Sequence, residues 1–204
     1  MSMHLSDKID KAIKSIYHQF NGHMGYRTID GFCRMALKPF GIRTTFYFSD
    51  ELDHGDFTIA GQYDSERKRQ PILITLVFSR NDIGHDFFWN EEKRKKFCFE
   101  LSQVSQHELI HKQQNEARNT EESGYVVERD PQKQLESYLG NKDEIEAYAH
   151  DIALEMKHMG LSVSENPWNS LNSYQIYKTA FDGSDWKKVH DRLIKKVVYW
   201  MENL

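Results

Sequence analysis

The spacing of apolar residues predicts helices first and strands second along the N-terminal half of the chain. Apolar side chains recur every three to four positions over residues 9–20 and again over 28–37, which is the period of a helix with one buried face. From residue 44 onward, apolar and polar positions alternate instead, as they do in half-buried strands. We expect strands over residues 44–48, 57–63 and 71–78, and the third is apolar on both faces. Short polar connections between them favour an antiparallel meander.

In the C-terminal half the spacing of apolar residues predicts helices joined by loops. Asn90 is expected to cap a long helix that runs to about residue 117, because two acidic residues follow it at the positive end of the helix dipole. A polar stretch over 119–134 predicts a loop, and further helices are expected over 142–157 and in the region from 174 to the C-terminus.

These elements predict an α+β fold, with a small antiparallel or mixed sheet packed on the long helix and additional helices at both ends. We expect a single domain over residues 1–204. Its expected parts are N-terminal helices over 1–40, a core over 41–160 and a C-terminal helical extension over 161–204.

Composition narrows the classes of protein that fit this pattern. The 204 residues carry a net charge of -4 with lysine and arginine scattered along the chain, which disfavours a dedicated nucleic-acid-binding protein. No segment has the roughly 20 consecutive apolar residues of a membrane span. Cys33 and Cys98 lie among apolar neighbours and are interpreted as buried free thiols in a reducing compartment. Because residues 1–10 are charged and have no apolar core, we expect no secretory signal and a cytoplasmic protein.

The segment His107-Glu108-Leu109-Ile110-His111 has the pattern HExxH. Residues four apart lie one turn apart on the same helix face, so the two imidazoles can hold one Zn²⁺. The glutamate beside them can act as general base on a water at the metal. Chance gives about 0.04 such matches in a chain of this composition. The apolar face of the predicted helix also continues into these residues, where ionisable groups are costly unless a metal or a partner satisfies them.

A catalytic zinc site needs a third protein ligand and one open position. The extended pattern HExxHxxGxxH is absent, because Gln114 occupies the glycine position and no third histidine follows nearby. The third ligand is therefore expected from a later helix, and the acidic segment over residues 143–151 is the leading candidate.

An HExxH helix followed by a helical Glu-x-x-Ala resembles the gluzincin branch of the zincin metallopeptidases. More narrowly, residues 138–149 resemble the corresponding end of short metallopeptidases inferred from tailed-bacteriophage genomes. The resemblance implies a zincin-like fold and a glutamate as the third zinc ligand. Both Glu144 with Ala147 and Glu146 with Ala149 fit the motif. Glu144 is preferred because it matches the form in which an apolar residue follows the glutamate.

The resemblance implies a zinc metallopeptidase that hydrolyses peptide bonds in a peptide or protein substrate, in the cytoplasm of a bacterial host if a phage encodes it. Zn²⁺ would be held by His107, His111 and Glu144, with Glu108 as general base. In zincins a sheet edge above the cleft receives an extended peptide. Tyr148 and His150 are weaker candidates for stabilising an oxyanion. The alternative is a phage structural or morphogenesis protein that retains a non-catalytic zinc site.

Overall fold

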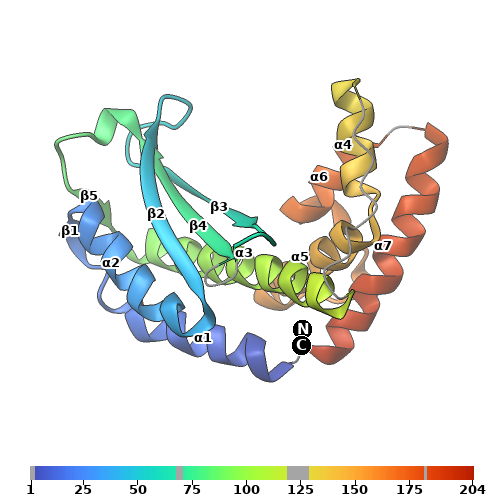
Figure 1. The fold of residues 1–204 in the computed structure, drawn as a ribbon, viewed down its shortest axis with the longest axis horizontal. Helices are drawn as coiled ribbons and strands as arrows, with labels where there is room; N and C mark the ends of the chain where they lie inside the picture. The colour runs from blue at the N-terminus through green and yellow to red at the C-terminus, as the bar shows by residue number, and fades with distance from the viewer. Residues whose placement is uncertain (1–2, 68–70, 119–128, 182) are drawn as a thin grey trace. The chain divides into compact units, whose positions relative to one another are not determined.

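The computed structural model describes residues 3–67, 71–118, 129–181 and 183–204, and this part of the chain has the expected α+β composition (Figure 1). It contains seven α-helices, a three-stranded sheet and a two-stranded sheet. The helices are α1 (Met3–Tyr17), α2 (Tyr26–Leu37), α3 (Glu91–Ala117), α4 (Pro131–Leu139), α5 (Lys142–Met159), α6 (Asn172–Ala180) and α7 (Gly183–Asn203). The strands are β1 (Gly22–Met24), β2 (Ile42–Ser49), β3 (Phe57–Tyr63), β4 (Ile72–Ser79) and β5 (Phe87–Trp89).

Contacts within the chain divide it into two compact units, Met1–Lys112 and Gln113–Leu204. The division falls inside α3, whose last residues belong to the second unit. The arrangement of residues 1–204 as a single zincin-like domain remains a prediction.

The three-stranded sheet of the first unit is mixed, and its strand order is β2-β4-β3. β2 pairs with β4 in parallel, beginning at Ile42 with Ile72, whereas β3 pairs with β4 in an antiparallel hairpin. The expected antiparallel meander is therefore wrong. A meander would place β3 in the middle, but β4 is the strand that is apolar on both faces, and the centre of the sheet is where both faces of a strand are buried. β3 is consequently an edge strand.

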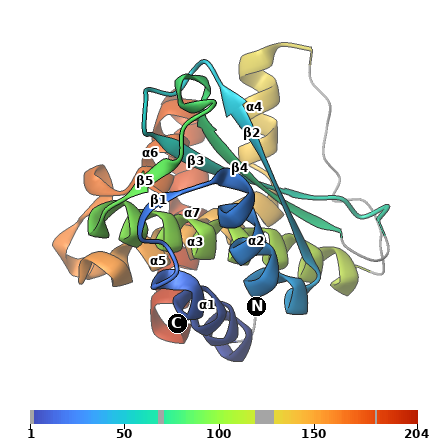
Figure 2. The same cartoon turned by 90° about the vertical axis from the view of Figure 1, so that its left-hand side faces the viewer.

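Aromatic rings fill the core between this sheet and the helices of the first unit. Phe97 of α3 is fully buried, and its ring centroid lies 5.2 Å from that of Phe20, 5.3 Å from Phe57 and 5.0 Å from Trp89. Figure 2 shows the three strands crossing over α3. These contacts seat the N-terminal half of α3 beneath the sheet, so the face that α3 turns toward β3 is fixed by packing.

A buried polar network holds α1 against the opposite face of α3. Ser6 Oγ donates to Gln106 Oε1 at 2.5 Å, and Gln106 Nε2 donates to Asp10 Oδ1 at 3.1 Å. Ser102 also donates to Asp10. Because successive helical residues are rotated by about 100°, fixing Gln106 toward α1 also fixes the direction in which its neighbour His107 leaves the helix.

The second unit is built on the apolar face of α5, which packs against α6 and α7. Its buried residues include Ile145, Ala149, Ile152, Ala153 and Met156, as the sequence pattern predicted. The expected loop over 119–134 is wrong at its C-terminal end, where α4 begins at Pro131; residues 119–128 lie outside the described part of the chain. Asp130 caps α4 by accepting hydrogen bonds from the backbone of Gln132 and Lys133. The helix was missed because the segment is polar, although a proline in the first turn after a capping aspartate is typical of a helix N-terminus.

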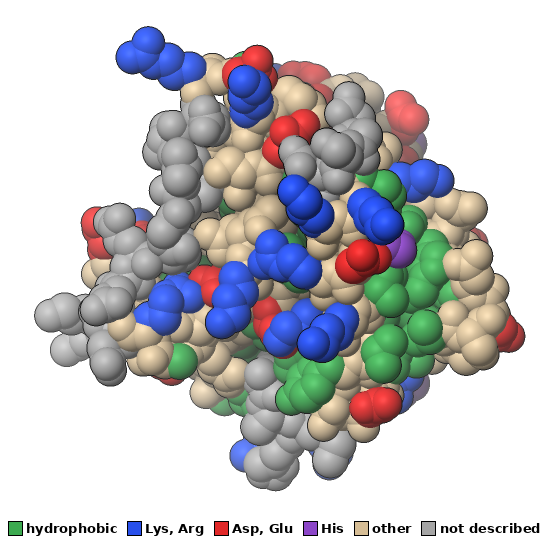
Figure 3. Space-filling view, turned by 90° about the vertical axis from the view of Figure 1, so that its right-hand side faces the viewer, with side chains coloured by type: hydrophobic (Ala, Val, Ile, Leu, Met, Phe, Trp, Pro, Cys, Tyr) green, Lys and Arg blue, Asp and Glu red, His purple; other side chains and the backbone are tan. Residues whose placement is uncertain are grey.

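Within the described ranges, no helix combines the length and apolar character needed to cross a membrane. On the face drawn in Figure 3, lysine and arginine side chains are interleaved with acidic ones, and hydrophobic side chains gather beside them. Both cysteines are free thiols, as expected; Cys33 is buried, whereas Cys98 is only partly buried.

Candidate metal centre

The HExxH segment lies well inside α3, where the helix is regular on both sides of it. Asn90 caps the helix as predicted, since its side chain accepts a hydrogen bond from the backbone N–H of Lys93 at 2.8 Å. Glu91 and Glu92 occupy the first turn, where the helix dipole favours negative charge. Hydrogen bonding and ion pairing with Lys95 lower the pKa of Glu91, which keeps this carboxylate charged. A capped helix of 27 residues gives the two histidines a rigid common support.

His107 and His111 present their Nε2 atoms to the same point. The two nitrogens are 3.0 Å apart, and the ring centroids are separated by 4.8 Å. A tetrahedral zinc ion with Zn–N bonds of about 2.0–2.1 Å requires its two nitrogen ligands to be about 3.3 Å apart. The observed separation is a few tenths of an ångström shorter, so both imidazoles can serve one ion with a small side-chain adjustment.

Glu144 of α5 completes a group of three ligands. The ligand atoms of His107, His111 and Glu144 all lie within 4.8 Å of one another, and Glu144 is buried. Among the residues that the structure describes, this is the one cluster of three or more His, Cys, Asp or Glu side chains that could hold a metal ion. We call it the His-His-Glu group.

The alternative ligand Glu146 lies elsewhere. Its carboxylate forms an ion pair with Lys196 of α7. Because two residues along a helix correspond to a rotation of about 200°, Glu144 and Glu146 face nearly opposite directions. The structure therefore places Glu144, and not Glu146, beside the histidines.

The donor set fits a divalent transition metal. Two imidazole nitrogens and one carboxylate, with a coordination position left open, form a common ligand set of catalytic zinc. The same set also suits non-haem iron, so the donors alone do not identify the metal. Tyr177 of α6 is a buried neighbour whose hydroxyl donates to the backbone oxygen of Leu139 at 2.8 Å. Burial raises the pKa of Tyr177, and the charge of Glu144 raises it further, so this phenol stays protonated.

Glu108 is buried against the edge strand β3 of the first unit. A Cβ atom placed on Gly61 would lie 2.5 Å from Glu108 Oε1 and 2.6 Å from Glu108 Cγ. The close approach of the Glu108 side chain to the strand therefore depends on the absence of a side chain at position 61. This contact could not be predicted, because nothing local links a glycine in a strand to a helix residue more than 40 positions later.

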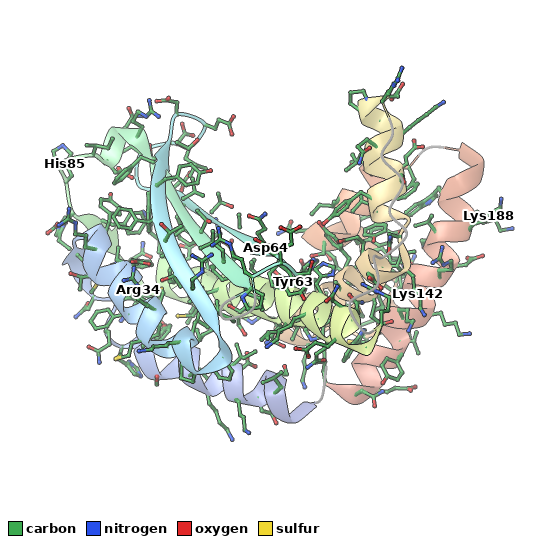
Figure 4. The ribbon with its side chains drawn as sticks, viewed as in Figure 1. Arg34, Tyr63, Asp64, His85, Lys142 and Lys188 are labelled. Atoms are coloured by element: carbon green, nitrogen blue, oxygen red, sulfur yellow. The ribbon has the colours of Figure 1, made fainter. Side chains whose placement is uncertain are left out.

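Two residues near the end of α3 hold the beginning of α5. Gln114 Nε2 donates to the backbone oxygen of Asp143 at 3.1 Å, and the Arg118 guanidinium forms an ion pair with the Asp143 carboxylate. Asn141 caps α5 by accepting from the backbone N–H of Asp143 at 2.9 Å. Lys142, the first residue of α5, is labelled in Figure 4. Sequence reasoning missed the roles of Gln114 and Arg118, although both follow His111 at helical spacing on its own face.

The two candidates for oxyanion stabilisation have different surroundings. The ring of Tyr148 packs at 5.2 Å from that of Tyr177 and fills space within the second unit. His150 is fully buried, and its ring centroid lies 4.9 Å from that of Trp200. His150 thus packs toward α7, and neither residue belongs to the His-His-Glu group.

Comparisons with protein-family models, with curated proteins and with solved structures find no match to this chain.

Proposed function

We propose that this protein is a zincin-like zinc metallopeptidase. The observation that carries the proposal is the combination of the His-His-Glu group with a buried carboxylate, Glu108, on the same helix as both histidines. A zinc ion that only stabilises a fold is held by four protein ligands, and it has no need of a general base beside it. Among the described residues the group has three candidate ligands, which would leave a fourth coordination position for a reactant.

The residues of the site would have two roles in peptide hydrolysis, metal binding and proton transfer. His107, His111 and Glu144 would hold Zn²⁺, which when bound supplies a Lewis acid that polarises the scissile carbonyl and lowers the pKa of water. Glu108 would accept the proton of the attacking water and return it to the leaving amine. Burial against β3 restricts Glu108 to few rotamers, so the carboxylate is held ready for this transfer.

The edge strand supports a peptide as the substrate class. β3 pairs with β4 along one side and has no strand partner on its other side among the described residues. An extended peptide can bind such an edge through backbone hydrogen bonds, and its side chains then alternate between the two faces. Glu108 contacts this strand at Gly61, so a peptide bound along β3 would pass close to the proposed base.

The test compares the wild-type protein with Glu108→Gln, which preserves size but removes the base. Zinc content is measured by elemental analysis, and cleavage is measured on dye-quenched casein and on a pool of random decapeptides read by mass spectrometry. We expect cleavage to fall about 10²- to 10⁴-fold, while zinc content is unchanged. Glu100→Gln, on the same helix but outside the group, is the matched control and should retain full activity.

Two outcomes contradict the proposal. Cleavage by Glu108→Gln at the wild-type rate would show that Glu108 is not the base. If the wild-type protein binds zinc and cleaves neither probe, and Glu108→Gln lowers its stability, the alternative of a structural or morphogenesis protein with a non-catalytic zinc site is favoured.

A further inference from the structure

The start of α5 is held at two points by the end of α3, and both points are on one residue. Gln114 binds the backbone of Asp143, whereas Arg118 binds its side chain. Gln114 and Arg118 are four residues apart and share one face of α3. The ion pair is largely shielded, because the side chain of Arg118 is 30% exposed and that of Asp143 is 14% exposed. All of these atoms belong to the second unit.

These contacts fix both the position and the rotation of the first turn of α5. A hydrogen bond to the backbone oxygen of Asp143 sets how far along α3 the turn lies. The ion pair to its side chain sets the rotation, because turning α5 by one residue, about 100°, would carry the Asp143 carboxylate away from Arg118. Glu144 is the next residue, so its direction is set together with that of Asp143.

The same face of α3 carries a proposed metal ligand. His111, Gln114 and Arg118 follow one another at steps of three and four residues along a continuous helix. One face therefore presents a histidine ligand and, one and two turns later, the two groups that hold the residue before Glu144. Groups that orient a metal ligand commonly contribute 10- to 100-fold to metal affinity.

We infer that Arg118, Gln114 and Asp143 are positioning residues that set Glu144 as the third metal ligand. This inference rests on the proposed zinc site, and it concerns the contacts that hold the third ligand of that site in place. Arg118 and Asp143 bind no metal themselves. Their ion pair preorganises the carboxylate of Glu144, so that zinc binding does not have to order the first turn of α5.

A second ion pair on α5 provides a matched control. Lys196 of α7 pairs with Glu146, and their side chains are 40% and 18% exposed, close to the values for Arg118 and Asp143. This pair also holds α5 but on the side away from Glu144. Loss of either ion pair should loosen α5 to a similar extent. Only loss of the Arg118 pair should displace Glu144.

The experiment measures the zinc dissociation constant by competition with a fluorescent chelator, together with the thermal midpoint of the metal-free protein. The variants are Arg118→Gln, Asp143→Asn, the conservative Arg118→Lys and the control Lys196→Met. We expect Arg118→Gln and Asp143→Asn to weaken zinc binding about 10- to 100-fold. Arg118→Lys should retain most of the affinity because it keeps the charge, and Lys196→Met should bind zinc as the wild-type protein does. The metal-free midpoints of Arg118→Gln and Lys196→Met should be similar.

Wild-type affinity in both Arg118→Gln and Asp143→Asn would overturn the positioning role and leave the proposed function intact. Equal losses in Lys196→Met and Arg118→Gln would also overturn it, because a general loosening of α5 would then explain the result. Absence of zinc binding by the wild-type protein would overturn the proposed function and this inference together.

Discussion

Replacing Gly61 with alanine is expected to displace the carboxylate of Glu108. The new Cβ would lie 2.5 Å from Glu108 Oε1, 2.6 Å from Glu108 Cγ and 2.8 Å from Val104 Cγ1. Carbon atoms in ordinary contact are about 3.5–4.0 Å apart, so the neighbours must retreat by about 1 Å. Val104 is β-branched and has little rotamer freedom in a helix. Glu108 must therefore make most of the adjustment.

The cost to stability follows from two opposing effects. Overpacking of this kind costs about 1–3 kcal/mol. Replacing glycine with alanine where the backbone permits it returns about 0.4–1 kcal/mol, because the unfolded chain loses conformational freedom. Gly61 is not among the residues with positive φ, so its backbone accepts alanine. We expect the free energy of unfolding to fall by roughly 0.5–2.5 kcal/mol.

Gly61→Ala should also lower the rate of peptide cleavage strongly, because it displaces the proposed base. A misplacement of about 1 Å of a catalytic group can lower a rate about 100-fold. Urea unfolding gives the stability of Gly61→Ala, and cleavage of dye-quenched casein gives its activity. Gly31→Ala is the control, because a Cβ on Gly31 in α2 would meet nothing within 4 Å. That variant should gain about 0.5–1 kcal/mol, as alanine does over glycine inside a helix.

The reasoning is refuted if Gly61→Ala is as stable as Gly31→Ala and fully active. If Gly61→Ala loses stability but keeps full activity, Glu108 does not need its place against β3 for catalysis.

Three further predictions concern the metal ligand, a thiol and the core. Glu144→Gln should weaken zinc binding by at least about tenfold, whereas Glu146→Gln should change it little because Glu146 pairs with Lys196; a chelator competition that ranks them in reverse would move the ligand to Glu146. Burial raises the pKa of Cys98 from 9.0 to about 12, so the folded chain keeps a proton that the unfolded chain loses. The free energy of unfolding should therefore fall as pH rises from about 9 toward 12, and urea titrations should show a smaller fall in Cys98→Ser. Phe97→Ala should cost about 3–5 kcal/mol, since its ring is fully buried among aromatic neighbours; a loss below 1 kcal/mol in urea unfolding would contradict the packing described for α3.

Elements whose signals are local could be predicted from the sequence. The cap at Asn90 and the HExxH spacing define α3, and alternation defines β3 with the bounds that the structure shows. The convergence of His107 and His111 also follows from spacing alone, because helix geometry places residues four apart side by side.

Features that depend on distant partners could not be predicted in the same way. Which of Glu144 and Glu146 lies beside the histidines depends on contacts between distant segments, such as the ion pair of Glu146 with Lys196 of α7. The strand order was missed because β2 and β3 both alternate, and only pairing decides which of them lies next to β4. A sequence pattern describes which face of an element is buried but does not name what buries it.

The order of the strands also has a consequence for how the chain avoids aggregation. β3 and β4 form a hairpin across a short connection, whereas each residue of β2 pairs with a β4 residue thirty positions later, as Ile42 does with Ile72. Hairpins close faster than contacts between distant segments, so β4 has one open edge until β2 docks. During that interval the apolar run Ile72–Ser79 combines high strand propensity with no charge, the composition of an aggregation-prone segment. Arginine and lysine residues over 67–69 and Arg80 flank this run, where charge opposes stacking of one chain on another.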